Sequence, residues 1–318
     1  MSADRKDARG WLLLLSVLWG GSFYFVGVAV KQLPPFTIVA ARVTIAAALL
    51  WLTAPATGLS PRKIRAEIGP LFLLGLLNNA IPFVLIVWGQ THLASGLASI
   101  LNASTPVITV IAAHFLMTTE RLNSRKFAGA LFGLAGVAAM IAPDLAHGLR
   151  QDLLAELAVL GAAFAYALSS LYGRRFRAAG LAPIDVAAGQ ITASSLMLVP
   201  LALIVDQPWT LREPSFEVVT AVLGLASLST ALAYIVYFRI LAGAGATNVM
   251  LVTLLAPATS ILLGALRLGE RLAPRHFFGL ALIAIGLALI DGRPVQAIAR
   301  HLACIRRRRP LVRRPKPN

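Results

Sequence analysis

The stretch ERLNSRKFAGALFGLAGVA (residues 120–138) recurs in altered form as ERLAPRHFFGLALIAIGLA (residues 270–288). Aligned from their first residues, the two stretches share Glu120/Glu270, Arg121/Arg271, Leu122/Leu272, Arg125/Arg275, Phe127/Phe277, Gly129/Gly279 and Gly136/Gly286. Matches of leucine, phenylalanine and glycine alone could arise if two helical hairpins converged on common membrane residues. Two Glu-Arg-Leu triplets in register with an arginine and two glycines favour a duplicated unit instead.

The composition indicates that most of the chain lies in a membrane. Hydrophobic residues make up 58% and charged residues 13%, and the mean hydropathy is +0.78. In a soluble domain about a quarter of the residues are charged. The apolar runs are continuous over about 20 residues, the length of a membrane-spanning helix, whereas the strands of a membrane barrel would alternate over shorter segments. We therefore expect an all-α integral membrane protein.

Charged or proline-containing breaks divide the apolar sequence into ten expected transmembrane helices: 11–31, 35–55, 69–90, 93–117, 126–143, 153–173, 184–205, 217–241, 246–267 and 276–291. The first run is too long for a cleaved signal peptide, so we interpret it as a retained helix. The expected organisation is a cytoplasmic N-terminus (1–10), two five-helix repeats (11–143 and 153–291) and a basic cytoplasmic tail (292–318).

The two Glu-Arg-Leu segments occupy corresponding places in the expected repeats. Each one ends the fourth span of its repeat and opens the fifth. Because five is an odd number, the second repeat must enter the membrane from the opposite side, so the repeats are expected to be inverted. Two inverted repeats are typical of a secondary transporter, whose substrate site lies between the halves near the membrane midplane.

The basic residues favour one orientation of these helices. If the N-terminus is cytoplasmic, the cytoplasmic side holds, before the tail, Arg5, Lys6, Arg9, Arg62, Lys63, Arg65, Arg121, Arg125, Lys126, Arg174, Arg175, Arg177 and Arg239. The other side holds only Lys31, Arg150, Arg212, Arg267, Arg271 and Arg275. The positive-inside rule therefore predicts a multi-pass protein with both termini in the cytoplasm.

The formal charge of +16 is concentrated in the tail IRRRRPLVRRPKPN (305–318). A basic run beside a hydrophobic segment predicts contact with anionic lipids of the bilayer. We expect no nucleic-acid partner, because no soluble domain carries the charge. A single cysteine, Cys304, excludes an internal disulfide framework, and the five histidines form no cluster with metal-ligand spacing. We expect no metal and no cofactor. A homodimer is compatible with the sequence.

The stretch LWGGSFYFVGVAVKQLPPFTIVAARVTIAA (18–47) resembles the opening of EamA-type transporters of the drug/metabolite transporter superfamily. The resemblance rests on a Trp-Gly-Ser-like turn, a Pro-Pro loop, an arginine in the second helix and the two Glu-Arg-Leu stretches, and it covers residues 10–291. It implies export or exchange of small metabolites, often amino acids or related compounds, across the bacterial inner membrane. The matching residues are Trp19, Gly20, Ser22, Pro34, Pro35 and Arg42, and we include Trp19 among the candidate substrate-binding residues.

Arg42 is the one Lys or Arg that the expected spans place well inside the membrane. It follows Pro35 by seven residues, which is roughly 10 Å of helix. A charge inside the hydrocarbon costs a few kcal/mol and needs a reason. One reason is an anionic substrate group, such as a carboxylate; the other is a structural role on a neighbouring helix. The corresponding position of the second repeat holds Gln190, so we expect both side chains to face inward.

The third and eighth spans carry polar and aromatic residues at corresponding places. Asn78 and Trp88 are the candidates in the third span, and Tyr234 and Tyr237 are those in the eighth, where Ser227 aligns with Asn78. Each set falls on one face of a regular helix. Aromatic walls with a few polar groups suit a small organic substrate. The alternative is that Trp88 belongs to the aromatic belt at the membrane interface.

Three prolines lie inside expected spans, namely Pro82, Pro106 and Pro257. Each should kink its helix, and transporters place such breaks around their sites. Asn102 and Asn248 flank two of these prolines and are secondary candidates for substrate binding. Kinks also occur for packing alone, so the prolines indicate a location rather than a chemistry.

All aspartates and glutamates are expected in loops or at span ends, with Glu156 among the outer-loop acids. The absence of an acid at mid-membrane argues against carboxylate-based ion coupling there. It also argues against an intramembrane enzyme, for which no catalytic constellation is present. We therefore expect an exporter or exchanger of small metabolites working by alternating access. A multidrug efflux carrier is the main alternative, and a channel or an intramembrane enzyme is a remote one.

Overall fold

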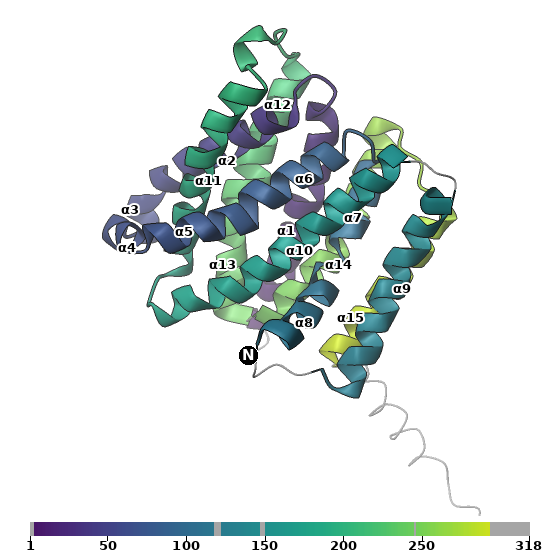
Figure 1. Cartoon of the computed structure of the whole chain (residues 1–318). Helices are drawn as coiled ribbons and strands as arrows, with labels where there is room; N and C mark the ends of the chain where they lie inside the picture. Colours follow the sequence, from purple (N-terminus) through teal and green to yellow (C-terminus); the bar gives the residue numbers. More distant parts are fainter. Residues whose placement is uncertain (1–2, 118–121, 147–149, 245, 293–318) are drawn as a thin grey trace, which may run out of the picture.

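The structure, a computed structural model, describes residues 3–117, 122–146, 150–244 and 246–292 (Figure 1). No β-strand occurs in these ranges. The α-helices are α1 (Ala3–Ala29), α2 (Pro35–Leu52), α3 (Ala54–Thr57), α4 (Pro61–Ala66), α5 (Ile68–Gly75), α6 (Ile81–Gly89), α7 (Ser95–Asn102), α8 (Thr105–Leu116), α9 (Ser124–Ala146), α10 (Arg150–Ala178), α11 (Pro183–Val205), α12 (Phe216–Ala226), α13 (Ala233–Ala244), α14 (Ala246–Leu263) and α15 (Pro274–Asp291). Three π-helical turns, η1 (Leu76–Ala80), η3 (Ser227–Leu232) and η4 (Gly264–Leu268), and one 3-10 turn, η2 (Pro208–Thr210), complete the elements.

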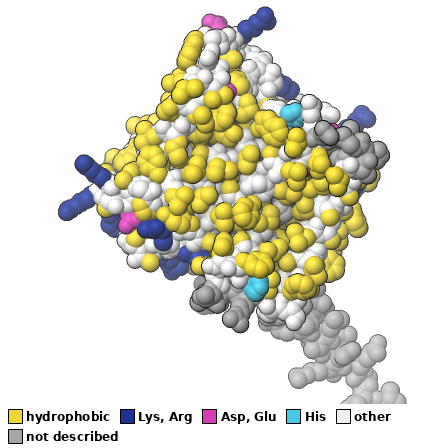
Figure 2. All heavy atoms as spheres, in the orientation of Figure 1, with side chains coloured by type: hydrophobic (Ala, Val, Ile, Leu, Met, Phe, Trp, Pro, Cys, Tyr) yellow, Lys and Arg dark blue, Asp and Glu magenta, His cyan; other side chains and the backbone are white. Residues whose placement is uncertain are grey.

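The lengths and composition of the helices fit a membrane. Within the described ranges, nine helices are long and apolar enough to cross a bilayer, and a shorter apolar helix covers Val252–Leu268. Hydrophobic side chains cover much of the visible face, and lysines and arginines lie at its edges (Figure 2). Helices satisfy their backbone hydrogen bonds within each segment, which a hydrocarbon surrounding requires. The prediction of an all-helical membrane protein is confirmed.

Two of the spans are built around π-helical turns. The third span runs from α5 through η1 into α6, and the eighth runs from α12 through η3 into α13. Pro82 lies in the first turn of α6, directly after η1. Pro106 lies in the first turn of α8, where the fourth span is interrupted. By contrast, α14 continues through Pro257, because a membrane helix can accommodate a proline by local adjustment.

Two aspartates link α2 and α11, one at each end of the pair. Asp206, which follows α11, accepts hydrogen bonds from the backbone N–H of Thr37 (2.6 Å) and from its hydroxyl (2.9 Å), in the first turn of α2. Asp185, in the first turn of α11, accepts from the backbone N–H of Ser60 (2.7 Å), beyond the end of α2. The start of each helix therefore meets the end of the other, and the two helices run antiparallel.

Helices α9 and α15 lie side by side (Figure 1). A Cβ atom on Gly129 would come within 2.6 Å of the Gly286 carbonyl oxygen, and one on Gly136 within 2.6 Å of the Gly279 carbonyl oxygen. Only glycine allows this approach, which is typical of close helix packing in membranes. Residue numbers rise along α9 as they fall along α15, so this pair is antiparallel as well.

The second Glu-Arg-Leu segment contacts the beginning of the fourth span. The carboxylate of Glu270 accepts hydrogen bonds from the backbone N–H of Ser95 (2.9 Å), from the Ser95 hydroxyl (2.7 Å) and from the backbone N–H of Gly96 (3.4 Å). It thereby satisfies N–H groups that the start of α7 leaves without helical partners. Glu120, the corresponding residue of the first segment, lies outside the described residues.

The expectation that Glu156 belongs to an outer loop is wrong. Glu156 lies in α10, inside the candidate span Gln151–Ala178, and its side chain is fully buried. Helix α10 begins earlier than the apolar run alone indicates, and it packs closely on α6: a Cβ on Gly89 would lie 3.2 Å from the Ala155 carbonyl oxygen. Packing on a neighbouring helix therefore buries a residue whose charge suggested a loop.

Candidate functional site

Arg42 lies in the interior of the helix bundle. It is a residue of α2 and is 8% exposed. Its Nε donates a hydrogen bond to the hydroxyl of Thr230 in η3 (2.9 Å), and its guanidinium carbon lies 3.5 Å from the centre of the Phe83 ring. Thr230 in turn donates to the carbonyl oxygen of Leu225 (2.8 Å). The π turn and the ring hold the guanidinium from two sides.

Three of the other predicted residues meet beside this arginine. The side-chain amide of Asn78 in η1 donates to the amide oxygen of Gln190 in α11 (3.0 Å) and to the hydroxyl oxygen of Tyr234 in α13 (3.2 Å). The Tyr234 phenol also lies within electrostatic range of Arg42, which places the two groups in one cluster. Arg42 and Gln190, which were expected to face inward, are both buried.

Several residues of the cluster were not selected from the sequence. Asn79 is fully buried, and its amide oxygen accepts from the Tyr234 hydroxyl (3.0 Å). The hydroxyl of Ser169 in α10 lies 2.9 Å from the amide oxygen of Asn78 and 2.8 Å from the carbonyl oxygen of Tyr166. The Tyr166 phenol also lies within electrostatic range of Arg42.

The π turns explain why Asn79 was missed. A regular helix would turn consecutive residues such as Asn78 and Asn79 about 100° apart, so the sequence suggested only one inward side chain. In a π turn the hydrogen bonds span five residues and the register shifts. Both asparagines of η1 therefore bond to Tyr234. The same shift in η3 brings Thr230 to Arg42, whereas the Ser227 hydroxyl bonds back to the carbonyl oxygen of Leu223 in its own helix (2.6 Å).

The cluster joins the two halves of the chain by matching bonds. Arg42 in α2 reaches the π turn of the eighth span, and Gln190 in α11 reaches the π turn of the third span. These two residues occupy corresponding positions in the sequence halves. We call the set Arg42, Phe83, Asn78, Asn79, Tyr166, Ser169, Gln190, Thr230 and Tyr234 the central cluster.

Two groups of the central cluster keep hydrogen-bond donors without acceptors. Among the described residues, Arg42 donates only through Nε, which leaves both terminal nitrogens of the guanidinium. The amide nitrogen of Asn79 is buried and has no partner there either. Buried donors are normally paired, and an unpaired one in a native structure requires an explanation. A ligand that accepts hydrogen bonds would supply the missing partners.

Trp19 and Tyr237 form a separate aromatic contact. Their ring centres are 5.8 Å apart, between α1 and α13, and they pack on a small apolar group that contains Leu15 and Val236. Tyr237 lies one turn beyond Tyr234, so this pair borders the helix that carries part of the central cluster.

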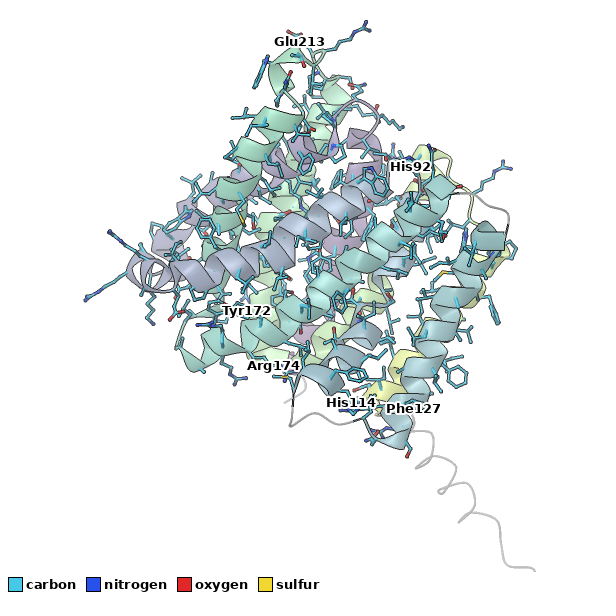
Figure 3. All side chains as sticks on the ribbon, viewed as in Figure 1. His92, His114, Phe127, Tyr172, Arg174 and Glu213 are labelled. Atoms are coloured by element: carbon cyan, nitrogen blue, oxygen red, sulfur yellow. The ribbon has the colours of Figure 1, made fainter. Side chains whose placement is uncertain are left out.

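Two predicted residues are placed elsewhere, and the side chain of a third is not described. Trp88 packs on His92 (5.4 Å between ring centres), and His92 is exposed at one end of the bundle, remote from Arg174 and His114 (Figure 3). This position fits the interfacial alternative for Trp88. Asn102 ends α7, and its buried amide oxygen has no partner in the described part of the chain. The side chain of Asn248 lies outside the described residues.

Comparison with known proteins places this arrangement in a family. A profile of the EamA-like transporter family matches residues 9–142 and again residues 153–291. The "Probable amino-acid metabolite efflux pump" of Escherichia coli (strain K12) is 25% identical over 293 residues, which cover 89% of this chain and 94% of that protein. The "Probable terminal-alkyne amino-acid exporter" of Streptantibioticus cattleyicolor is 26% identical over 288 residues, which cover 89% of this chain and 93% of that protein.

A solved structure shows the same fold. It is described as "Crystal structure of protein", and it superposes on this chain with a TM-score of 0.64 at 22% identity, covering 90% of this chain and 97% of that one. At this identity the likeness concerns the fold alone. The family profile, in contrast, matches most of the sequence. The chain therefore belongs to the EamA-like transporter family.

Proposed function

We propose that this protein is a secondary transporter that exports or exchanges small metabolites, amino acids and related carboxylates among them, across the bacterial inner membrane. The observation that carries the proposal is the central cluster, in which Arg42 bonds to Thr230 and Gln190 bonds to Asn78 in the interior of the helix bundle. Both bonds connect one half of the chain to the other. A site between two halves is where a transporter binds its substrate.

The architecture that we propose is a pair of inverted five-helix repeats with ten spans. The family profile matches each half separately. Helices α2 and α11 correspond in the two halves and run antiparallel, as do α9 and α15. Corresponding helices that point in opposite directions are what an inverted repeat requires. The basic residues then favour cytoplasmic termini.

Arg42 is the proposed anchor for a substrate carboxylate. A guanidinium is planar, and two of its N–H groups can bind both oxygens of a carboxylate. The Nε bond to Thr230 and the stacked Phe83 ring fix the plane of the group, and the terminal nitrogens remain for the substrate. Neutralising a cation in the membrane interior offsets part of its insertion cost.

The central cluster also provides a substrate-free state. Asn78 donates to both Gln190 and Tyr234, so the acceptor oxygens of these two side chains have a partner when no substrate is bound. A substrate would replace some of these hydrogen bonds, and the helices that carry them would then move relative to one another. Asn78 lies in the π turn η1 and Thr230 in the π turn η3, and π turns are frequent at functional sites.

Counterflow in proteoliposomes tests the proposal. Each batch of vesicles would be loaded with one unlabelled amino acid or related carboxylic acid from a panel. Saturable uptake of the same compound in labelled form would then be measured. Arg42→Gln should lower the uptake by about tenfold or more, because a charged bidentate contact is lost. Arg62→Gln, at an exposed arginine of α4, is the control. Saturable uptake of cationic drugs in place of carboxylates would favour a multidrug carrier, and ionic conductance without saturation would favour a channel.

A further inference from the structure

We propose that the central cluster selects organic acids with a net negative charge over zwitterionic amino acids of the same size. This inference rests on the proposed function and specifies its substrate class. It comes from the balance of charges and of hydrogen-bond donors and acceptors around Arg42. Among the described residues, no carboxylate forms an ion pair with Arg42, and the titratable groups near it are two neutral phenols, Tyr166 and Tyr234.

The acceptors of the central cluster are already engaged. The amide oxygen of Gln190 accepts from Asn78, and that of Asn79 accepts from Tyr234. The amide oxygen of Asn78 lies within hydrogen-bond distance of the Ser169 hydroxyl. The Leu225 carbonyl oxygen, just ahead of η3, accepts from Thr230. Each of these oxygens has a second lone pair, but an ammonium group would have to share the oxygen with a donor that is already in place.

The donors of the central cluster show the opposite condition. The terminal nitrogens of Arg42 and the amide nitrogen of Asn79 have no acceptor in the described part of the chain. The Asn79 side chain is fully buried, and Asn79 neighbours Asn78 in the same π turn. Carboxylate oxygens accept several hydrogen bonds and donate none. A carboxylate therefore matches what the cluster lacks.

The charge balance leads to the same class of ligand. A monoanion makes the pair with Arg42 neutral, whereas a zwitterion leaves the net charge of the site at +1. The α-ammonium group would also lie close to the guanidinium, in surroundings where like charges repel more strongly than in water. Replacing the ammonium group by a hydroxyl or oxo group removes both penalties and keeps the carboxylate.

Matched substrate pairs test this selectivity. Leucine and 2-hydroxy-4-methylpentanoate share a carbon skeleton, as do phenylalanine and 3-phenyllactate, and each pair differs only in ammonium against hydroxyl. Counterflow by the wild-type protein should favour the hydroxy acid of each pair by about tenfold or more, because the zwitterion leaves a charged donor unpaired. Arg42→Gln should remove this preference.

An isosteric variant provides the converse test. Asn79→Asp places a carboxylate in the cluster without changing the shape of the side chain, and it should shift the preference of each pair towards the amino acid. Asn123→Asp, at an exposed asparagine that caps the first turn of α9 through the Lys126 N–H, is the matched control and should leave the preference unchanged.

The outcomes separate this inference from the proposed function. Wild-type counterflow that is saturable but equal for both members of a pair, or faster for the amino acid, would overturn the anion selectivity while leaving the transporter intact. Absence of counterflow for every carboxylate tested, by protein that is folded and monodisperse, would overturn the proposed function and the selectivity with it. An Asn79→Asp protein that behaves as the Asn123→Asp control would contradict the position assigned to Asn79.

Discussion

The Nε atom of Arg42 lies 2.9 Å from the hydroxyl oxygen of Thr230, although the two residues are 188 positions apart in the sequence. One neutral hydroxyl from the second half of the chain thus orients a cation from the first half. Thr230 accepts from Arg42 and donates to Leu225, so its single proton is fully used. Such a bond makes Thr230 a positioning residue for whatever Arg42 binds.

Thr230→Val should therefore raise the KM for transport by about fivefold, the equivalent of one hydrogen bond of about 1 kcal/mol. Valine keeps the volume and the branching of threonine, so the thermal stability of the protein should change little. Initial rates of counterflow over a range of substrate concentrations measure the effect. Thr220→Val, at an exposed threonine of α12, should leave KM unchanged. An equal rise of KM in both variants would contradict the role assigned to Thr230.

The bond between Asn78 and Gln190 should appear as a coupling energy between the halves of the chain. In a double-mutant cycle of Asn78→Ala and Gln190→Ala, we expect about 0.6 kcal/mol, the average for such bonds in membranes. Unfolding in mixed micelles provides the free energies. A second cycle that pairs Asn78→Ala with Thr192→Ala should give no coupling, because Thr192 bonds to Trp51 instead.

Gly136→Ala should destabilise the protein by about 1–3 kcal/mol, the cost of inserting a methyl group where none fits. The added methyl would meet the carbonyl oxygen of Gly279 and would force α9 away from α15. Gly21→Ala is the matched substitution, since nothing lies within 4 Å of a Cβ at that position. Unfolding midpoints of the two variants should differ clearly, and similar midpoints would show that the helices separate at no cost.

Glu270→Ala should cost about 1 kcal/mol of stability, the usual effect of removing a side chain that accepts from the N–H groups of a helix start. The Ser95 and Gly96 N–H groups would lose their partner. Glu213→Ala removes an exposed carboxylate at the tip of the α11–α12 connection and is the control (Figure 3). If both variants have the same free energy of unfolding as the wild type, the Glu270 contact does not contribute to stability.

Membrane orientation is testable with single cysteines. In a Cys304→Ser background, His92→Cys should react with a membrane-impermeant thiol reagent from outside the cell, and Arg174→Cys should react only after the membrane is opened. The two positions are exposed near opposite ends of the bundle (Figure 3). The reverse pattern of labelling would contradict cytoplasmic termini.

The sequence predicted the helices and part of the central cluster. Long apolar runs decide where helices lie, because the membrane requires every backbone group to be bonded within its segment. Arg42 and Gln190 were identifiable because polar side chains are costly in such runs. Their hydrogen-bond partners were not all identifiable, since Asn79 depends on the register of a π turn and Ser169 depends on which helices are neighbours.

Other errors have the same origin. Trp88 was grouped with Asn78 on one face of a regular helix, but η1 changes the register between them, and Trp88 packs on His92. Glu156 was assigned to a loop from its charge, yet it is buried where α10 packs on α6. Periodicity describes a single helix, whereas both of these outcomes depend on contacts between helices.

The contact between α9 and α15 also explains why the chain repeats a segment. Gly129 corresponds in sequence to Gly279, yet it lies against Gly286, which is the counterpart of Gly136; Gly136 in turn lies against Gly279. Each helix therefore presents the same surface to the other. A bulky substitution in either copy of the segment would therefore strike the other copy, so the glycines of both copies are constrained by one shared contact.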